Sequence, residues 1–489
     1  MKTEAYLGLD IGGTGVKAGV FSRDGRLLAF GRRSFEPTVS REGHVDISID
    51  TIHESAREVV REAAGESGAK ILAMAVSSQG ETFVSLDEND RPLHDAIMWY
   101  DSRAVRQAGE LCNAVQSATG RKPPIDAVAT VSKIKWLFEN RPEIMKKARR
   151  FLLLPDYISY RLAGLAVIDT NTAASTGLLT PDDNEYDPAV LKAGGIDVSR
   201  LSTILIPGTP IGKIKPPAAE NWGLSAETLL VAGTNDQYAG ALGAGNCRTG
   251  ILSETSGTCL ALVTLTKKRP LGLPEGLLSG KFPLPSHWFI LAYSKTAGLV
   301  LDWFRREFFP SASWKDMEQS ALAVSPGSND LLALPHFDGT ISPVPNQSAR
   351  GAFCNLTLRH TRADMFRALL ESLAYSLREN IELMARNGYP VDVIRSIGGG
   401  AQNNLWLQIK ADVTGMSIEK PVVAEAAVLG AAMLAASGNG EFKSPAESSE
   451  RFYKTERVFT PNKDCAQIYR THFENYLGLK ARLYGEQRA

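Results

Sequence analysis

The chain has 489 residues, more than one ordinary hydrophobic core holds, so we expect two domains. Lys plus Arg and Asp plus Glu are equal at 54 each, and this balance excludes the strongly basic surface that binds nucleic acid or an anionic membrane. Charged residues within the first ten positions predict no signal peptide, and no uncharged stretch reaches the roughly 20 residues of a membrane span. Five cysteines without C-x-x-C spacing are typical of reduced thiols, so we expect a cytoplasmic protein. The balance of charges predicts a small-molecule substrate.

The first motif along the chain is a glycine-rich turn between two short strands. Residues 6–19, YLGLDIGGTGVKAG, predict a strand, a turn at 12–15 and a second strand through Phe21. Backbone N–H groups in such a turn, with the Thr14 hydroxyl among them, suit a phosphate, and Asp10 could hold Mg²⁺ through water. The alternative is a plain glycine-rich hairpin.

Two better-known nucleotide motifs are excluded. Gly13, Gly15 and Ala18 match the dinucleotide fingerprint as text, but that fingerprint needs its last position inside a helix, and residues 17–21 are typical of a strand. A Walker A motif would need Ser or Thr after a Gly-Lys pair, which the sequence lacks.

Two loops in the first half carry residue types that bind polyols. Residues 79–82, QGET, follow a predicted buried strand over 71–77, at the carboxyl end where ligands gather in open α/β sheets. Residues 99–103, WYDSR, then place an aromatic ring beside the Asp101 carboxylate. The alternatives are a solvated loop acid at Glu81 and a core ring beside a surface ion pair at 99–103.

A strand-to-helix corner follows at residues 231–245, VAGTNDQYAGALGAG. A β-leaning apolar run over 228–232 meets Gly-Thr-Asn-Asp, and small residues suited to a tightly packed helix come next. Asp236 lies at this corner, where outward-pointing backbone N–H groups tolerate an anion and a carboxylate can take a proton from an alcohol. The alternative is that Asn235 or Asp236 caps the helix.

The N-terminal pattern returns in the second half as a weak internal repeat. Residues 250–264 again predict a strand, a Ser/Gly/Thr turn at 255–258 and a strand. Residues 394–415, IRSIGGGAQNNLWLQIKADVTG, predict a strand, three glycines and a helix capped by Asn403 or Asn404. Glycines there let a flat ring lie against the backbone, and a capping amide can reach a purine or ribose.

The spacing of apolar and small residues predicts the larger helices, which we expect over 51–66, 130–140, 295–309, 364–386 and 425–437. Residues 181–220 are rich in Pro, Gly and Asp and predict loops with short pieces of regular structure.

Together these segments resemble the FGGY family of carbohydrate kinases, within the actin, hexokinase and Hsp70 superfamily, over essentially the whole chain. DIGGTGVKA is similar to the first phosphate motif, ETSGT to the second, and GGGAQNNLWLQIKADVTG, followed by EAAVLGAAMLA, to the adenosine motif. TVSKIKWLFEN resembles the first family signature, and GAFCNLTLRHTRADMFRALLES, with Glu371 at its acidic end, resembles the second. WYDSR resembles the sugar-site segment W-x-D-x-R, and GTNDQYAGALG the segment that carries the catalytic base.

The resemblance implies an α/β fold with two RNase H-like, actin-like ATPase domains, about 1–245 and 246–489, flanking a catalytic cleft that closes to exclude water. It implies an ATP-dependent kinase for a hydroxyl of a small sugar or polyol, and a homodimer is one assembly to expect because dimers are common in the family. Asp236 would be the general base, and Mg²⁺ would lie near Asp10 and Asp236. ATP would meet Thr14, Gly15, Lys17, Gly257, Thr258, Gly399, Gly400, Ala401 and Asn404, and the sugar would meet Gln79, Glu81, Trp99, Asp101 and Gln237.

Departures from the family pattern leave the substrate open. The second signature has Asn355 where glycine is usual, and residues 339–343 replace the Gly-Glu-Arg-x-Pro loop of many xylulokinases. Residues 79–82 differ from the Gln-Met-His-Gly of xylulokinases and are closer to glycerol kinases, which carry Arg where Gly80 stands. Ketopentoses such as xylulose or ribulose are the expected substrates, with deoxy-ketoses and polyols such as glycerol or erythritol as alternatives.

Two other functional classes share the superfamily. A nucleotide-gated ATPase without a sugar acceptor would have no reason to keep WYDSR beside Glu81. A sugar-sensing regulator would need a DNA-binding segment, and we expect none because the first strand begins at residue 5 or 6 and the net charge is zero.

Overall fold

The computed structural model describes residues 3–180, 185–257 and 259–485. They form two compact units: unit 1 comprises Met1–Gly243 and Ala427–Phe452, and unit 2 comprises Ala244–Ala426 and Tyr453–Ala489. The chain therefore passes between the units three times. Residues 427–452 pack with unit 1, although they lie within the C-terminal range 246–489 expected from the sequence.

Unit 1 is built on a six-stranded sheet in which three neighbouring strands run parallel. The strands, in sheet order, are β12 (Pro210–Lys213), β13 (Leu229–Asn235), β6 (Lys70–Ser78), β1 (Glu4–Gly12), β2 (Gly15–Ser22) and β3 (Leu27–Ser34). β13, β6 and β1 are parallel, whereas β1, β2 and β3 form an antiparallel meander. This confirms the predicted strand, turn and strand at the N-terminus, and residues 17–21 lie within β2, as the rejection of the dinucleotide fingerprint requires.

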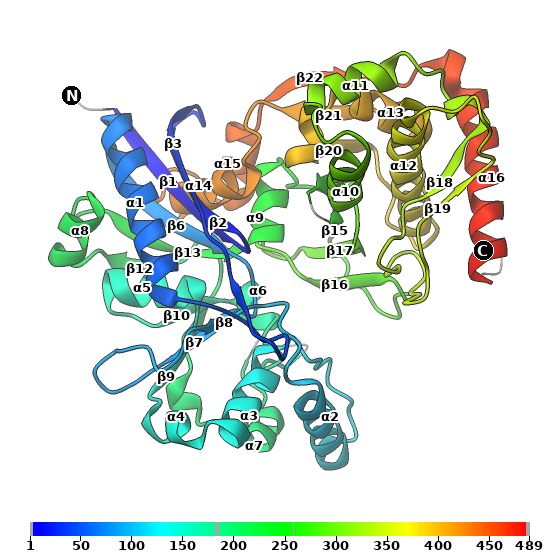
Figure 1. Ribbon diagram of the computed structural model, residues 1–489. Coiled ribbons are helices and arrows are strands. Elements are labelled where there is room, and N and C mark those ends of the chain that lie inside the picture. The colour runs from blue at the N-terminus through cyan, green and yellow to red at the C-terminus, as the bar shows by residue number, and fades with distance from the viewer. Residues whose placement is uncertain (1–2, 181–184, 258, 486–489) are drawn as a thin grey trace. The chain divides into compact units, whose positions relative to one another are not determined.

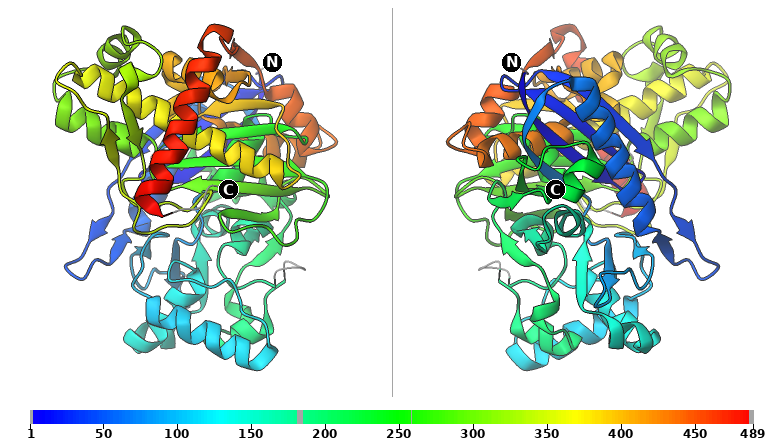
Figure 2. Two further views of the ribbon diagram at one scale, coloured as in Figure 1. Left: turned by 90° about the vertical axis from the view of Figure 1, so that its right-hand side faces the viewer. Right: turned by 90° about the vertical axis from the view of Figure 1, so that its left-hand side faces the viewer.

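Helix α1 (Ile49–Ser67) covers β2 and β3, as Figures 1 and 2 show. Its apolar side chains recur at three- and four-residue spacing, so one face is buried against the sheet. Ser48 accepts a hydrogen bond from the backbone N–H of Thr51 at the start, and Gly68 ends the helix with a φ of 58°. The predicted helix over 51–66 is confirmed.

A smaller lobe of unit 1 has its own hydrophobic core, which contains Phe83, Ile97, Leu111 and Ile134. Its strands pair in the order β4 (Thr38–Val39), β5 (Val45–Ile47), β8 (Ala96–Ile97), β7 (Phe83–Leu86) and β9 (Arg150–Leu153). The helices and short strands that complete this lobe are α2 (Val105–Thr119), α3 (Thr130–Asn140), α4 (Pro142–Lys147), β10 (Val167–Asp169), α6 (Thr170–Ala174), α7 (Pro188–Gly194) and β11 (Thr203–Leu205). Two other helices of unit 1, α5 (Leu154–Ala163) and α8 (Pro216–Trp222), pack instead into the core of the six-stranded sheet. The short pieces expected within 181–220 are confirmed, with residues 181–184 outside the described part of the chain.

Three helices complete unit 1: α9 (Asp236–Gly243) and α14 (Ala426–Gly438), which are rich in small residues, and α15 (Pro445–Phe452). A Cβ at Gly430 would lie 1.9 Å from the carbonyl oxygen of Ala239, and a Cβ at Gly8 would lie 1.9 Å from that of Val428. Glycine is therefore required for α14 to approach both α9 and β1. This confirms the predicted helix over 425–437 and its close packing at Gly430.

Unit 2 repeats the central arrangement of unit 1. Its strands, in sheet order, are β16 (Leu277–Lys281), β17 (Trp288–Ser294), β15 (Leu260–Thr266), β14 (Ile251–Ser256), β20 (Val393–Ile397), β21 (Ile418–Pro421) and β22 (Thr455–Phe459). As with β1 in unit 1, the central strand β14 has an antiparallel meander on one side and parallel strands on the other. The weak sequence repeat thus corresponds to a repeated sheet topology.

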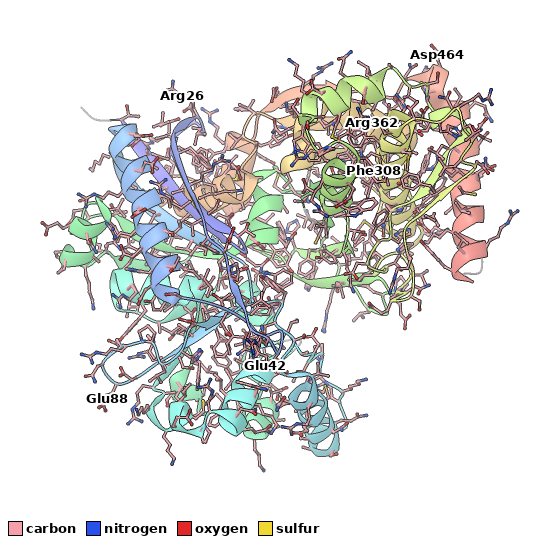
Figure 3. All side chains as sticks on the ribbon, viewed as in Figure 1. Arg26, Glu42, Glu88, Phe308, Arg362 and Asp464 are labelled. Carbon is pink, nitrogen blue, oxygen red and sulfur yellow. The ribbon has the colours of Figure 1, made fainter. Side chains whose placement is uncertain are left out.

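The helices of unit 2 are α10 (Gly298–Phe308), α11 (Trp314–Leu322), α12 (Arg362–Arg386), α13 (Asn404–Thr414) and α16 (Ala466–Tyr484). α10 begins three residues later than predicted, because Ala297 has a non-helical φ of −143° and ψ of −92°. Arg362, at the start of α12, lies beside Phe308 at the end of α10 and donates a hydrogen bond to its carbonyl oxygen at 3.1 Å (Figure 3). Among the described residues, no helix has the length and apolar character needed to cross a bilayer.

Candidate active site

Three parallel strands of unit 1 bring the expected reaction residues to one edge of the sheet. Register places Asp10 of β1 opposite Ser77 of β6, and Ser77 opposite Thr234 of β13. The segments that follow these strands are the first glycine turn, the loop beginning at Gln79 and the Asp236 corner. Because parallel strands end at the same edge, these three segments gather there.

Asp236 is the first residue of α9, and the helix is capped by its neighbour. The Asn235 Oδ1 atom accepts a hydrogen bond from the backbone N–H of Gln237 at 3.1 Å, so the capping role left open by the sequence falls to Asn235. Asp236 is half-buried, and burial raises the pKa of its carboxyl to about 6, against the opposing effect of the Gln237 backbone N–H. A carboxylate with that pKa is suited to accept a proton near neutral pH.

Glu81 lies in the same electrostatic neighbourhood as Asp236. Its φ of 52° places it in the left-handed region, which is uncommon outside glycine. Burial raises the pKa of Glu81 to about 7, Lys133 and the Ser175 hydroxyl oppose this rise, and the charge of Asp236 adds to it. Two carboxyl groups with raised pKa values therefore belong to one site.

Lys133 is a site residue that the sequence did not reveal. It lies on α3, within the first signature, and its side chain is wholly buried. The ammonium donates to the carbonyl oxygens of Met98 at 2.8 Å and Trp99 at 2.9 Å. Burial lowers the pKa of Lys133 to about 8, against the charges of Glu81 and Asp101. A lysine one position from the apolar stripe of a buried helix is the signal that could have found it, since lysine is almost never fully buried without a partner.

Gln79 offers a buried amide without a partner. Its side chain is 4% exposed, and neither its Oε1 nor its Nε2 atom has a hydrogen-bond partner among the described residues. A Cβ at Gly13 would lie 3.3 Å from Gln79 Oε1 and 3.4 Å from the indole Nε1 of Trp99. The first glycine turn therefore brings its backbone against both side chains. A buried amide without a partner costs folding free energy unless a ligand or ordered water satisfies it.

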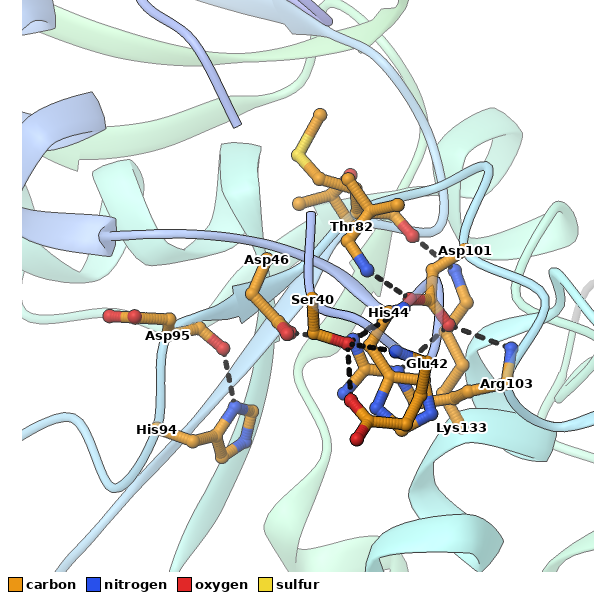
Figure 4. Close-up of polar contacts among 12 residues, drawn as sticks. Ser40, Glu42, His44, Asp46, Thr82, His94, Asp95, Asp101, Arg103 and Lys133 are labelled. Carbon is orange, nitrogen blue, oxygen red and sulfur yellow. Dashed lines mark hydrogen bonds and ion pairs between the residues drawn. The ribbon is translucent and has the colours of Figure 1, made fainter. Parts of the chain in front are cut away.

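Asp101, which the resemblance assigns to the sugar, has partners for both carboxylate oxygens within the protein. It is wholly buried, and both of its oxygens are occupied within unit 1 (Figure 4). Oδ1 accepts from the backbone N–H and the Nε of Arg103 at 2.9 and 2.8 Å, and Oδ2 accepts from the Val45 N–H at 2.6 Å and Arg103 Nη2 at 2.8 Å. A carboxylate accepts about four hydrogen bonds, so we infer that Asp101 holds Arg103 and the preceding Trp99 segment in place.

The expected phosphate and metal residues of unit 1 lie around the first turn. Asp10 accepts a hydrogen bond from the Ser77 hydroxyl at 3.0 Å and faces Lys17 across the β1–β2 pair. Thr14 is exposed at the turn, and a Cβ at Gly15 would lie 2.4 Å from the Arg33 carbonyl oxygen, so packing against β3 also requires glycine there. No cluster of three or more metal-ligating residues occurs in the described part of the chain. Two carboxylates with water fit Mg²⁺, which keeps several waters and shares phosphate ligands.

The expected nucleotide residues of unit 2 follow two neighbouring parallel strands. Thr255 of β14 is opposite Ile397 of β20, so the turn at Gly257 and the glycine corner after β20 lie next to each other. A Cβ at Gly257 or Gly399 would meet nothing within 4 Å, so both positions face open space. At Gly400 a Cβ would lie 2.4 Å from the Cβ of Ser256, so that glycine is required for packing.

The remaining positions of this corner divide between packing and exposure. Ala401 is 2% exposed and packs inward. Asn403 caps α13 by accepting from the Trp406 backbone N–H at 2.8 Å, which leaves Asn404 exposed.

Two expected site residues lie outside this corner. In unit 1, Gln237 is half-buried beside Asp236. Thr258 lies outside the described residues.

Comparisons with known proteins agree over nearly the whole chain. The model of the FGGY family of carbohydrate kinases, N-terminal domain, matches residues 5–243, and that of the C-terminal domain matches residues 253–438. A xylulose kinase of Bacillus subtilis (strain 168) is 29% identical over 482 residues, covering 96% of this chain and 95% of that protein. A gluconokinase of the same strain is 30% identical over 499 residues, covering 98% and 96%. The crystal structure of ligand-bound xylulose kinase from Lactobacillus acidophilus has the same fold, with a TM-score of 0.88, 24% identity and 99% coverage of both chains.

Proposed function

This chain belongs to the FGGY family of carbohydrate kinases, and on that premise we propose that it phosphorylates a hydroxyl of a ketopentose such as xylulose or ribulose. The chain is an ATP-dependent carbohydrate kinase with an alcohol group as acceptor. Asp236 is the proposed general base, and the edge of the unit 1 sheet is the proposed acceptor site.

The observation that carries this proposal is the unsatisfied amide of Gln79, which lies in the same loop as Glu81 and at the sheet edge where β13 leads into Asp236. An amide donates and accepts hydrogen bonds, as do the hydroxyl and carbonyl groups of a ketose. The Trp99 ring, which lies against Gly13 beside this amide, offers a flat face for the C–H groups of a sugar. A neutral acceptor suits the site better than an aldonate such as gluconate, because Glu81 and Asp236 are carboxyl groups and the Lys133 ammonium already donates to Met98 and Trp99.

Gly80 separates this site from the glycerol-kinase pattern, in which an arginine stands at that position. A Cβ at Gly80 would lie 2.6 Å from the Ser175 Oγ atom and 3.3 Å from Asn235 Nδ2. Both neighbours belong to the Asp236 corner or contact Glu81. An arginine would therefore displace the residues that place the base, which supports a ketose over glycerol as the substrate.

The proposed mechanism assigns positioning and proton transfer to the protein. Phosphoryl transfer has a loose transition state with little covalent work for side chains, so alignment and charge neutralisation carry most of the rate enhancement. Asp236 accepts the proton of the attacking hydroxyl, while Gln79, Glu81, Trp99 and Gln237 orient the acceptor. Mg²⁺, when bound near Asp10 and Asp236, would offset negative charge on the phosphate oxygens. The open positions Gly257 and Gly399 offer backbone surface to the nucleotide.

A coupled ADP-release assay across a panel of acceptors tests the proposal. The panel contains xylulose, ribulose, a deoxy-ketose, gluconate, glycerol and erythritol, with ATP and Mg²⁺ present and each omitted in turn. We expect a ketopentose to give the highest kcat/KM, at least about tenfold above gluconate and glycerol. A best acceptor that is an aldonate or glycerol would contradict the substrate class, and ADP release that is independent of acceptor would contradict the kinase mechanism.

Three further parts of the proposal concern the state of the protein rather than its reaction. We propose a homodimer, a cytoplasmic location and no nucleic-acid partner. Analytical ultracentrifugation of the purified chain tests the first, cell fractionation the second, and the absence of nucleic acid from the purified protein the third.

A further inference from the structure

Unit 2 contains a lysine and a glutamate that are both removed from solvent. Lys410 on α13 is 1% exposed, and Glu254 on β14, within the ETSGT segment, is 0% exposed. Lys410 Nζ donates to both Glu254 carboxylate oxygens at 2.9 Å. It also lies 3.9 Å from the centroid of the Trp406 ring, so the ammonium has a charge partner and an aromatic face.

The hydrogen-bonding capacity of this pair is fully used inside unit 2. The third contact of Lys410 Nζ is the Ser256 Oγ atom at 3.1 Å. The two Glu254 oxygens also accept from the hydroxyls of Ser256 and Ser396. Lys410 thus makes three donor contacts and Glu254 accepts four, so neither group is left to bind a ligand directly.

These contacts join the two turns that unit 2 offers to a nucleotide. Glu254 and Ser256 end β14, just before the turn at Gly257. Ser396 is the last but one residue of β20, just before the glycine corner, and Lys410 lies on α13, which begins just after that corner. The two turns also touch directly, because a Cβ at Gly400 would lie 2.4 Å from the Ser256 Cβ.

We propose that Lys410 and Glu254 are positioning residues for the nucleotide: their ion pair fixes Ser256 and thereby the spacing between the turn at Gly257 and the glycine corner at Gly398–Ala401. This inference rests on the proposed function, because it assigns those turns to ATP. The contacts of the pair described above lie within unit 2, whereas the sugar residues and Asp236 belong to unit 1.

A purely stabilising role explains this pair less well. Taking two charges out of water is costly, and replacing a buried ion pair with packed apolar residues is often neutral or stabilising. What such a pair adds is a constraint on geometry, because its directional hydrogen bonds hold β14, β20 and α13 in fixed positions relative to one another. That constraint acts where the backbone has glycines and little side-chain packing to hold its shape.

The first experiment measures nucleotide affinity in Lys410→Met. Calorimetry with ADP is expected to show a dissociation constant at least about tenfold higher than in the natural protein, from loss of a buried hydrogen-bonded charge. The KM for ATP should rise in parallel, and the KM for the sugar should change less than about threefold. Unchanged ADP affinity in a folded Lys410→Met protein would overturn the inference.

Lys480→Met is the matched control. Lys480 is also a buried lysine of unit 2, and it pairs with Glu379 of α12 at 2.8 Å from its place on α16. We expect Lys480→Met to lower the melting temperature while leaving ADP affinity within about twofold. An equal loss of ADP affinity in both lysine variants would mean that general destabilisation, and not position, explains the effect.

A charge-neutral double variant covers the case in which Lys410→Met fails to fold. Glu254→Gln with Lys410→Gln leaves no unpaired charge and keeps groups that can hydrogen-bond. Its ADP affinity should still fall at least about fivefold, and normal affinity would overturn the inference. Since these readouts need no sugar, they are separate from the proposed function: natural protein that binds ADP but phosphorylates no acceptor refutes that function alone.

Discussion

The two units contain comparable strand-to-helix corners, and they differ in how completely their polar groups are satisfied. In unit 1, β13 leads into α9, with Asn235 as the cap; in unit 2, β20 leads through three glycines into α13, with Asn403 as the cap. An asparagine performs the same capping task in both. Each corner also has a buried lysine nearby, Lys133 in unit 1 and Lys410 in unit 2.

The two lysines show the difference between the corners. Lys410 is enclosed by Glu254 and Ser256, and every polar atom of that group has a partner. Lys133 donates to backbone carbonyl oxygens, while Glu81 keeps a raised pKa and the Gln79 amide lacks a partner in the described structure. Unit 1 therefore presents polar groups that a substrate can complete, whereas unit 2 presents a rigid backbone surface.

The largest expected effect is that of Asp236→Asn. The amide cannot accept the hydroxyl proton, so kcat should fall by roughly 10³-fold, within the range that one general base contributes. The ADP dissociation constant should stay within about twofold, because most of the residues proposed to contact the nucleotide belong to unit 2 and Asp236 is not one of them. Steady-state kinetics and ADP calorimetry measure the two quantities. Near-normal turnover would remove Asp236 from the mechanism, and a parallel loss of ADP affinity would break the division between the corners.

Lys133→Met comes next and mirrors the Lys410 variant. It removes the ammonium donor from the Trp99 carbonyl oxygen, whereas that of Met98 still accepts from the Asp101 N–H, and an unsatisfied buried group costs about 1–3 kcal/mol. We expect kcat/KM for the sugar to fall about 10- to 100-fold, while the KM for ATP changes little. For Lys410→Met we expect the opposite pattern, in which the KM for ATP rises and the KM for the sugar changes little. One set of initial-rate measurements therefore tests both variants. A similar rise of both KM values in Lys133→Met would show that the two corners are not functionally separate.

The pH profile should report the raised pKa of Asp236. As the proposed base, Asp236 acts only when it is ionised, and its pKa is about 6. The value of kcat/KM for the sugar should therefore fall about tenfold per pH unit below pH 6 and be insensitive to Asp236 above about pH 7. Glu81→Gln is the control, because it removes the neighbouring carboxyl group while leaving the base. A profile that stays flat down to pH 5 would contradict the assignment.

The smallest expected effect is on thermal stability, where two glutamates should behave oppositely. The pKa of Glu81 in the folded protein is about 7, above its ordinary 4.5, so stability falls as the pH rises from 4.5 to 7, and the full loss remains above pH 7. Glu81→Gln should raise the melting temperature by a few degrees at pH 8, and this gain should shrink as the pH falls from 7 towards 4.5. Glu254→Gln should lower the melting temperature at pH 8, because it removes the carboxylate that pairs with Lys410. Calorimetric melts at pH 6 and 8 check both signs.

Local patterns predicted most of the framework because each rests on few residues. The strand, turn and strand at 6–21 and the capped helix at 404–414 follow from glycine placement and apolar spacing. The choice between Asn235 and Asp236 as the cap could not be made from sequence, since both residue types serve. The backbone explains why Asn355 can replace the glycine that is usual in the second signature. Its φ of 70° lies in the left-handed region, which suits glycine and which asparagine tolerates better than most residues.

The tertiary contacts of charged residues could not be predicted from the sequence. Asp101 could pair with a sugar or with Arg103, and only the fold shows that Val45 also donates to it from 56 positions away. Lys133 and Lys410 lie in segments resembling family motifs, yet their partners come from other elements. The amide of Gln79 is predicted from its loop, but its lack of a partner among the described residues depends on burial.

The return of residues 427–452 to unit 1 has a consequence for biosynthesis. During translation the first 243 residues leave the ribosome long before α14, which packs through Gly8 and Gly430 against β1 and α9. Until then, the nascent chain exposes the apolar faces that α14 will cover. A polypeptide stopped after residue 245 would lack this cover permanently, so it should be recovered in inclusion bodies, while a polypeptide that appends residues 427–452 by a flexible linker should stay in the supernatant.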